Sequence, residues 1–246
     1  MTRYWLLLLL LLPAALSAGI TEDFEHGISL YDQGDFDAAA MAWQDIVDQG
    51  YVSAELYYNL GCAYFKAGEL GYAIVNFRRA ERLAPDDEDI KINSQFAQLF
   101  MVDKIEAVPG SFFPDQVLSF LSKLHPNQYF WISLAAFALL FVVLSLKRFG
   151  WARRWGNATA TIFLIVTILS AASMIWVLDS NYLIEEGVIV VSETEVQSGP
   201  GVDFELQFTG HEGLTFKILD SRNDYYLGLF ANKLKGWIKK SAVVRI

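Results

Sequence analysis

The sequence predicts a multidomain membrane protein with an all-helical repeat domain, a hairpin of two apolar helices and a small all-β domain. Three observations lead to this fold class. A repeat with a period of about 34 residues runs through the N-terminal part. Two stretches without charged residues flank a short basic loop in the middle. Short apolar runs separated by glycines and polar residues fill the C-terminal part, which is typical of a small barrel or sandwich.

Residues 1–18 have the layout of a secretory signal peptide. Arg3 precedes an apolar run and small residues follow it, so cleavage is expected after Ser17 or Ala18. No cysteine follows the run directly, which excludes a lipoprotein signal. The alternative is an anchor that stays uncleaved, and both alternatives export the chain that follows.

Two units of equal length begin the repeat domain, which is expected over residues 20–103. Glycine, alanine and aromatic residues recur at the same positions of both units. Small residues let two helices approach closely, and aromatic side chains fill the space between them. The units are 20–53 and 54–87, and the matching pairs are Gly27 with Gly61, Gly34 with Gly68, Ala39 with Ala73 and Trp43 with Phe77.

The second unit closely resembles the tetratricopeptide repeat, whereas the first departs from that pattern at Ile46 and Tyr51. A half unit at 88–103 is expected to cap the array. The acidic cluster Asp86–Asp89 suggests either a metal site or the N-terminus of the cap helix, and we favour the helix because no calcium-loop spacing is present. The signature positions are Tyr57, Leu60, Gly61, Tyr64, Gly68, Ala73, Phe77, Ala80 and Pro85.

The resemblance implies a peptide-binding groove, because the first helix of each unit lines the concave face of tetratricopeptide arrays. The alternative is that the cap helix and the following linker cover this face. Cys62 could also be a nucleophile paired with His26, but a lone cysteine with apolar neighbours is usually a small core residue. Carried over by register, the groove would contain Phe24, Ile28, Tyr31, Tyr58, Cys62, Phe65 and Lys66.

A connector at 104–128 leads into the apolar hairpin, and its stretch Val117–Leu124 suggests a short helix at the membrane interface or against the repeats. Each uncharged stretch is long enough to cross a ~30 Å hydrocarbon core. Short basic loops stay in the cytoplasm, so both soluble domains should lie outside it. A buried hairpin of a soluble protein is the alternative, although such helices rarely lack a polar face. The expected spans are 129–146 and 158–178, and the loop at 147–157 carries Lys147, Arg148, Arg153 and Arg154.

Residues 183–246 resemble the bacterial SH3 domain. The matching segments are Ser198–Gly201, Phe208–Gly213, Gly236–Ile238 and Val243–Ile246. The resemblance implies a small SH3-like barrel with a ligand groove, although the tryptophan usual before the distal hairpin is replaced by tyrosine. The alternative for the tryptophan at 237 is a plain core position. The groove would contain Phe204, Tyr225, Tyr226 and Trp237.

The sequence shows no catalytic grouping, so we expect a protein that is not an enzyme and that needs no cofactor or metal. Its three histidines fall in three different parts of the chain. Residues 19–103 contain 16 acidic and 5 basic residues, a net charge of −11, which argues against nucleic acid as a partner. Cys62 is the only cysteine, so no internal disulfide can form.

The order of signal peptide, repeats, hairpin and SH3-like barrel resembles the BatE-type proteins of bacterial aerotolerance (Bat) operons. This resemblance implies a scaffold or adaptor in the inner membrane that works with von Willebrand A-domain proteins, a BatD-type protein and a MoxR-type ATPase. Two alternatives stay open. The barrel could bind peptidoglycan peptides in a wall-sensing protein, or the chain could be a chaperone-like adaptor of an envelope assembly machine.

Overall fold

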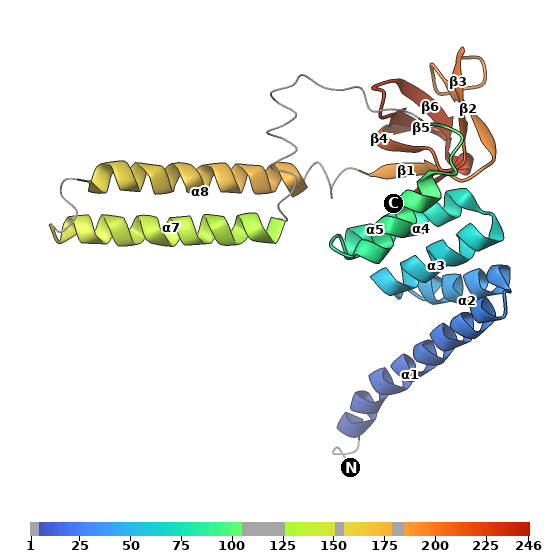
Figure 1. Cartoon of the computed structure of the whole chain (residues 1–246), viewed down its shortest axis with the longest axis horizontal. Coiled ribbons are helices and arrows are strands. Elements are labelled where there is room, and N and C mark those ends of the chain that lie inside the picture. Colours follow the sequence, from blue (N-terminus) through green and yellow to red (C-terminus); the bar gives the residue numbers. More distant parts are fainter. Residues whose placement is uncertain (1–4, 105–125, 151–154, 179–184) are drawn as a thin grey trace. The chain divides into compact units, whose positions relative to one another are not determined.

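The computed structural model describes residues 5–104, 126–150, 155–178 and 185–246, with the backbone alone for residues 5–18 and 126 (Figure 1). Arg153, Arg154 and the connector stretch Val117–Leu124 lie outside the described residues. The chain divides into two compact units, which are described separately. One combines Met1–Ala107 with Glu185–Ile246, and the other is Val108–Ile184.

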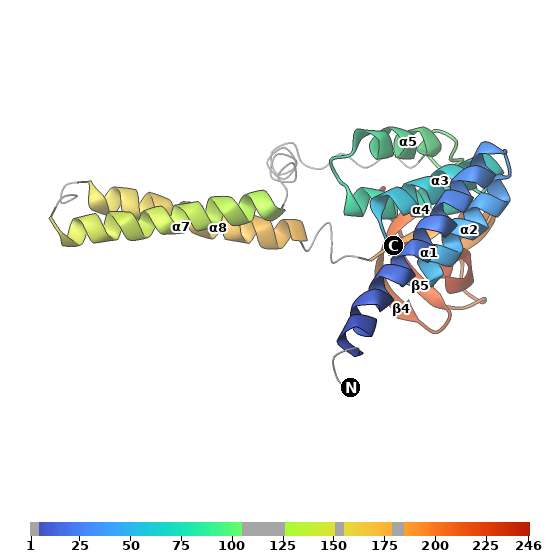
Figure 2. The same cartoon turned by 90° about the horizontal axis from the view of Figure 1, so that it is seen from below.

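Five helices form the N-terminal part of the first unit, and consecutive helices pack side by side (Figures 1 and 2). The first helix continues from the expected signal peptide into the first repeat unit without a break. The helices are α1 (Trp5–Asp32), α2 (Phe36–Asp48), α3 (Ala54–Ala67), α4 (Leu70–Leu83) and α5 (Glu88–Gln98).

The turns between these helices follow from glycines and short polar side chains. Gly34 and Gly68 have φ angles of 83° and 89°, which residues with a Cβ rarely adopt, and they end the first helix of each unit. Side-chain oxygens of Asp35, Ser53 and Asp87 accept hydrogen bonds from backbone N–H groups at the starts of α2, α3 and α5. The acidic cluster before α5 therefore contains the N-cap of that helix.

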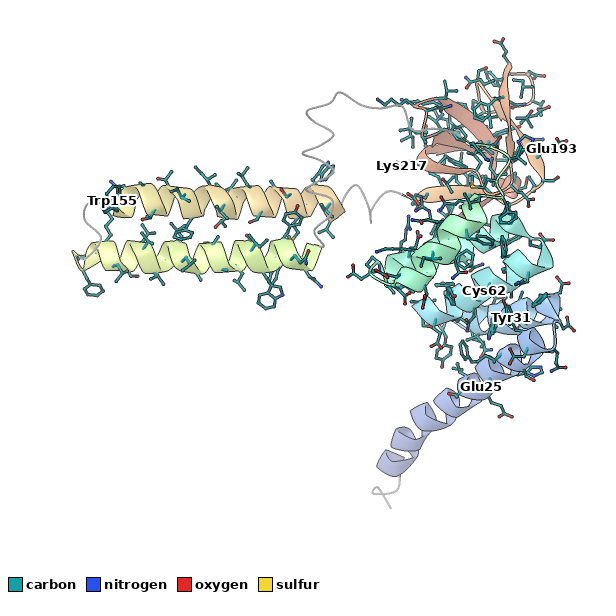
Figure 3. The ribbon with its side chains drawn as sticks, viewed as in Figure 1. Glu25, Tyr31, Cys62, Trp155, Glu193 and Lys217 are labelled. Atoms are coloured by element: carbon teal, nitrogen blue, oxygen red, sulfur yellow. The ribbon has the colours of Figure 1, made fainter. Side chains whose placement is uncertain are left out.

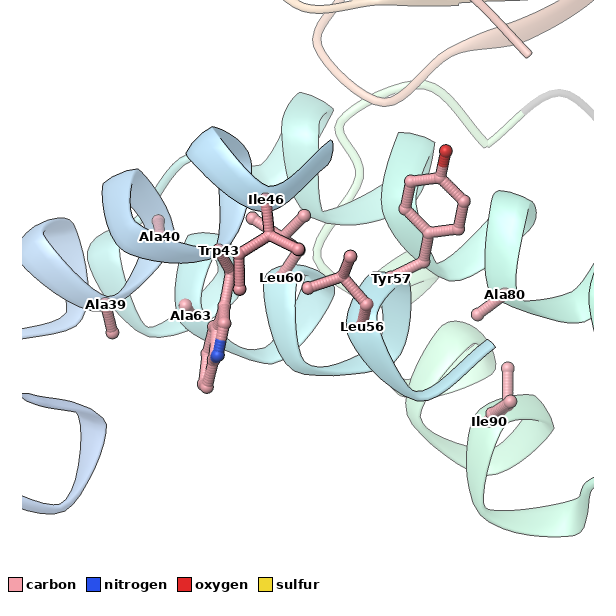
Figure 4. Packing of buried hydrophobic residues seen from close by; sticks show 10 residues of the cluster. All are labelled: Ala39, Ala40, Trp43, Ile46, Leu56, Tyr57, Leu60, Ala63, Ala80 and Ile90. Carbon is pink, nitrogen blue, oxygen red and sulfur yellow. The ribbon is translucent and has the colours of Figure 1, made fainter. Parts of the chain in front are cut away.

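Glycine also sets the distance between the two helices of each unit. A Cβ atom on Gly61 would lie 2.7 Å from the Phe77 ring, and one on Gly27 would lie 2.3 Å from Trp43 Nε1. Both pairs occupy matching positions of the two repeat units. Figure 4 shows Trp43 within the buried cluster between α2 and α3, and its indole N–H donates to the Phe24 carbonyl oxygen at 3.1 Å.

The C-terminal part of the first unit is one antiparallel sheet with the order β3-β2-β6-β5-β4-β1-β7. The sheet curls, because a Cβ on Gly210 in β3 would meet Ile189 of β1 at 2.7 Å, although four strands separate the two in the sheet order. The strands are β1 (Glu186–Ile189), β2 (Glu193–Gln197), β3 (Leu206–His211), β4 (Thr215–Arg222), β5 (Tyr225–Leu229), β6 (Lys235–Lys239) and β7 (Val243–Arg245).

The concave side of this sheet encloses a compact apolar core, which contains Ile189, Val196, Leu214, Phe216, Phe230 and Ile238. The Phe208 and Phe230 rings meet edge to face, with centroids 4.9 Å apart. An antiparallel β domain is therefore present, as expected. Its assignment as an SH3-like barrel stays a prediction.

The sheet and the repeats share a second apolar cluster, in which Val188 of β1 is buried against Ile74 and Leu70 of α4. The approach is close, because a Cβ on Gly71 would lie 2.7 Å from the Val190 Cα and 2.8 Å from the Ile189 carbonyl oxygen. The two halves of the unit are thus in van der Waals contact through backbone atoms.

Polar contacts surround this cluster. Asp103 accepts the backbone N–H of His211 at 2.6 Å and contacts its Nδ1 at 3.0 Å. Arg82 lies 3.7 Å from Glu186, and the Arg79 guanidinium donates to the Arg245 carbonyl oxygen at 3.1 Å. These contacts join the repeat part to the sheet, which lies more than 100 residues further along the sequence.

The second unit contains α7 (Pro126–Arg148) and α8 (Gly156–Leu178), which lie side by side. Both helices are long and apolar enough to cross a membrane, with a mean hydropathy of 2.3 in each. The contact between them includes the Ser133 hydroxyl, which donates to the Thr167 carbonyl oxygen at 3.4 Å. The basic residues Lys147 and Arg148 form the last turn of α7, and the Lys147 ammonium donates to the Asn157 side chain.

Candidate functional site

The expected groove residues lie on two helices of the repeat part, α1 and α3. Tyr31 of α1 and Tyr58 of α3 both interact electrostatically with Cys62 of α3, so these residues of the two helices lie near one another. Figure 3 labels Tyr31 and Cys62 on these helices. Six of the seven side chains are partly buried, and Lys66 is exposed. The six are Phe24, Ile28, Tyr31, Tyr58, Cys62 and Phe65.

The α1 part of this surface rests on α2. The Phe24 and Tyr31 rings each lie 6.1 Å from the Trp43 ring, and Tyr31 also meets Phe36 edge to face at 5.1 Å. These contacts give the two rings a fixed support, and they also remove much of their surface from a ligand. Phe24 and Tyr31 therefore contribute to the packing of the first unit.

Tyr58 and Cys62 form a hydrogen-bonded pair in the middle of the surface. Burial raises the pKa of the Tyr58 hydroxyl to about 12, with smaller contributions from Cys62 and Asp89. Burial also raises the pKa of the Cys62 thiol, although Tyr58 and Lys66 act in the opposite direction. A thiol with a raised pKa is a poor nucleophile at neutral pH, and the hydrogen-bonding partner of Cys62 is Tyr58 rather than His26.

The same face continues onto α5 and the turn after it. Ile92, Phe96, Leu99 and Phe100 follow Tyr58, Cys62, Phe65 and Lys66 by one full repeat period. The exposed fractions of these four side chains are 61%, 49%, 70% and 57%, respectively. The opposite side of α5, with Ile90, Ser94 and Ala97, is buried against the rest of the array.

An aromatic cluster joins α5 to the expected groove. Phe65 of α3 meets Phe96 and Phe100 edge to face, with ring centroids 5.6 Å and 5.3 Å apart, and Phe96 lies 5.2 Å from Phe100. Asn93 also donates a hydrogen bond to the Tyr58 hydroxyl at 3.0 Å. We call the exposed apolar side chains Ile92, Phe96, Leu99 and Phe100, together with Phe65, the α5 surface.

Sequence reasoning does not identify the α5 surface as a binding site. The sequence predicts that residues 88–103 form a cap, and a cap of a repeat array is expected to have a polar outer face. The helix forms as expected, but its outer face is apolar. The signal was present in the sequence, because each of the four positions lies one repeat period after a residue assigned to the groove.

The four aromatic residues expected to line the SH3-like groove are divided between different places. Tyr225 and Trp237 are diagonal neighbours on the outer face of the sheet, and both are nearly buried. Tyr226 pairs with Ile238 and packs against the apolar core on the other face. Phe204 is exposed in the loop before β3, where it packs against Gly199.

Two cations cover aromatic rings of this part of the sheet. The Arg222 guanidinium lies 5.6 Å from the centre of the Trp237 ring, and the Lys240 ammonium lies 5.2 Å from that of Tyr226. Trp237 is therefore shielded by a side chain of its own domain. The structure brings Tyr225 and Trp237 to one face and keeps Tyr226 away from it.

Comparison with known proteins identifies the repeat part. A family model described as the tetratricopeptide repeat matches residues 24–88, which extend from α1 to the start of α5. No curated protein matches the chain. The expected tetratricopeptide repeats are thus confirmed over the matched residues. Such repeats generally serve protein–protein interaction rather than catalysis, which supports a scaffold that is not an enzyme.

Proposed function

We propose that the chain is a membrane-anchored adaptor of the bacterial envelope, in which the repeat part holds a partner protein and the α7–α8 hairpin provides the anchor. The observation that carries this proposal is the α5 surface. It presents five neighbouring apolar side chains at the end of a repeat array, four of them well exposed. Contiguous apolar patches of this kind are typical of protein-binding sites.

The location of the surface supports a protein ligand. The first helices of successive repeat units line the face on which such arrays bind peptides, and α5 is the first helix of an incomplete third unit. Lys66 follows Phe65 at one end of this surface, and the acidic residues Asp87 and Asp89 lie in the first turn of α5 at the other end, where Lys91 also lies. A partner segment with an apolar centre and charged ends would fit this arrangement.

The shared core of the first unit supports the proposed topology. The repeats precede the hairpin and the sheet follows it, yet the two pack through Gly71, Ile74 and Val188. Such contact requires both halves to lie on one side of the membrane, and two spans return the chain to its starting side. The basic residues after the first span favour the cytoplasm for the connecting loop, which leaves the packed unit outside.

The partners proposed are those that the Bat resemblance implies, namely von Willebrand A-domain proteins and a BatD-type protein. The test is copurification of the full chain from native membranes with identification of the bound proteins. The double variant Phe96→Ser and Phe100→Ser should lose at least about 90% of the partner, because truncation of an anchoring aromatic residue often costs above ~2 kcal/mol. The variant Tyr58→Ala with Phe65→Ala should have a similar effect.

The matched control is Met41→Ser, which removes a side chain that is 64% exposed on α2, outside the α5 surface. Its partner recovery should equal that of the unchanged chain. Variants of Tyr225 and Trp237 should weaken copurification less. If the Phe96 and Phe100 variant retains its partner while the Tyr225 and Trp237 variant loses binding to isolated cell walls, the wall-binding alternative replaces this proposal.

A further inference from the structure

The array itself shows what covers the face to which the α5 surface belongs. Tyr31 of α1 interacts electrostatically with Cys62 of α3, which lies 31 positions later. Phe65 of α3 packs edge to face on Phe96 of α5, which again lies 31 positions later, with ring centroids 5.6 Å apart. The same contact register therefore occurs twice, and in both cases the first helix of one unit is covered by the first helix of the next.

The contacts between α3 and α5 show how such a covering helix is built. Phe96 and Phe100 are four positions apart, so they lie on one face of α5, and both meet the Phe65 ring edge to face. Asn93, one turn earlier, donates a hydrogen bond to the Tyr58 hydroxyl at 3.0 Å. The contacts advance in the same direction along both helices, so the covering helix runs parallel to the helix that it covers.

The corresponding positions on α5 itself are open. Leu99 corresponds to Phe65 and is 70% exposed, and Ile92 corresponds to Tyr58 and is 61% exposed, although both of the earlier side chains are partly buried. At each earlier first helix a following helix packs on this face, whereas α5 presents it to solvent. The repeat register thus identifies a position for one more helix beside α5, where the apolar side chains for its contact are already in place.

We propose that the α5 surface binds an amphipathic helix of a partner protein, which runs parallel to α5 and extends the array by one helix. The proposal rests on the proposed function of the α5 surface and specifies which kind of protein segment that surface receives. The covering helix α5 has 11 residues, so a partner helix of about three turns, roughly 17 Å long, matches it. Its contact face carries large apolar side chains four positions apart, as Phe96 and Phe100 are on α5.

Exposed carboxylates beside the surface favour a helix with basic residues at its edge. Glu88 and Asp89 lie in the first turn of α5, and within the described part of the chain neither carboxylate lies within 4.0 Å of a lysine or arginine nitrogen. Residues 87–91 have a formal charge of −2, and residues 19–103 have one of −11. A second copy of this chain would bring the same acidic charges to the surface, whereas a basic segment of another protein is attracted to them.

The experiment maps which partner residues lie against the α5 surface. A photo-reactive phenylalanine analogue replaces Ile92, Phe96 or Leu99 in three separate full-length chains, which are irradiated in native membranes, and mass spectrometry locates each adduct in the partner. Positions 92 and 99 are about 10.5 Å apart along the helix axis, which corresponds to about seven residues of a parallel helix but only about three of an extended segment. We expect adducts about seven residues apart in the partner, in the same order along both chains.

Variants test the helix and its charge separately. A proline in the middle of the crosslinked partner segment should lower the adduct yield from position 96 at least about tenfold, because proline breaks a helix, whereas alanine at the same place should keep it within about twofold. The variant Glu88→Gln with Asp89→Asn should lower that yield by about two- to fivefold. Its matched control is Asp37→Asn with Asp45→Asn, which removes two exposed carboxylates of α2 and should leave the yield unchanged.

Adducts about three residues apart, or an undiminished yield from the proline variant, would show that the partner segment is extended. Either result would overturn the helical ligand and leave the proposed function intact. Adducts between two copies of this chain, or within one copy, would overturn the proposal in favour of self-association or of a cover from the chain itself. The absence of a protein adduct from all three positions would instead refute the proposed function of the α5 surface.

Discussion

Gly71→Leu tests the contact that joins the repeats and the sheet into one compact unit. Any Cβ at position 71 would lie 2.7 Å from the Val190 Cα, whereas ordinary contacts begin at about 3.4 Å. The neighbouring atoms belong to the backbone of β1 and the residue after it, so no side-chain rotation can relieve the clash. The two halves would have to move apart by about 0.7 Å or more, since 3.4 − 2.7 = 0.7.

Two opposing effects determine how much Gly71→Leu changes the free energy of unfolding. Overpacking of this kind costs roughly 1–3 kcal/mol. Replacing glycine inside a helix returns up to about 1 kcal/mol, because leucine has the better helix propensity. We therefore expect the free energy of unfolding to fall by roughly 1–2 kcal/mol, which is a substantial part of the ~5–15 kcal/mol of a typical domain.

Hydrogen exchange locates this effect. In the Gly71→Leu chain, protection of the amides in Glu186–Ile189 should fall, because that strand loses its packing on α4. Amides of α2 and α3 should lose less protection, because they exchange through unfolding of the whole unit and not through separation of the two halves. Unchanged protection of β1 together with unchanged stability would refute the contact between α4 and β1 as described.

Three further predictions concern the repeats and the hairpin. Gly61→Leu should destabilise the repeats by roughly 1–3 kcal/mol, because the new Cβ would lie 2.7 Å from the Phe77 ring. Thermal unfolding measures the loss of stability, and an unchanged melting temperature would contradict this prediction. The pKa of Tyr58 is raised to about 12 from 10.0, so its contribution to stability is fully present below pH 10 and is lost as pH rises through 12. Burial also raises the pKa of Tyr31 and Tyr64, so ultraviolet titration should show a late tyrosine component that is smaller in Tyr58→Phe, and an undiminished late component in that variant would contradict the prediction. Alkaline phosphatase fused after Ile246 should be active and a fusion at Gly150 inactive, whereas the opposite pattern would reverse the topology.

The repeat part could be predicted from sequence because its physical determinants are local. Gly61 and Phe77 are matched by Gly27 and Trp43 at the same spacing, and the structure places each pair in direct contact. The turn glycines Gly34 and Gly68 likewise have left-handed backbone angles. These positions can be recognised in a sequence because only glycine satisfies the close approach of the two helices or the left-handed backbone angle of the turn.

No residue pattern in the sequence predicts the contact between the repeats and the sheet. In the sequence, Gly71 resembles an ordinary helical residue, and Val190 resembles part of a short strand. Asp103 and His211 meet across 108 positions of the chain, and neither belongs to a recognisable motif. Contacts between domains depend on the surfaces that two folded parts present, and a single sequence does not specify which surfaces will meet.

The α5 surface marks a further limit of what the sequence predicts. The repeat register predicts that Phe96 and Phe100 lie on the same face as the expected groove. It does not predict that they are exposed, because another part of the chain can cover the apolar face of the last helix of an array. Helical spacing identifies a face and does not determine what lies against it.

We propose above that the α5 surface binds a protein of the bacterial envelope. Its most direct test places a photo-crosslinking amino acid at Phe96 and, in a second chain, at Met41 on α2, and irradiates both in native membranes. We predict a discrete protein adduct from position 96 that is absent from position 41 and identifies a von Willebrand A-domain or BatD-type protein. Adducts with lipid alone from position 96, or the same protein adduct from both positions, would contradict binding of a partner protein at the α5 surface.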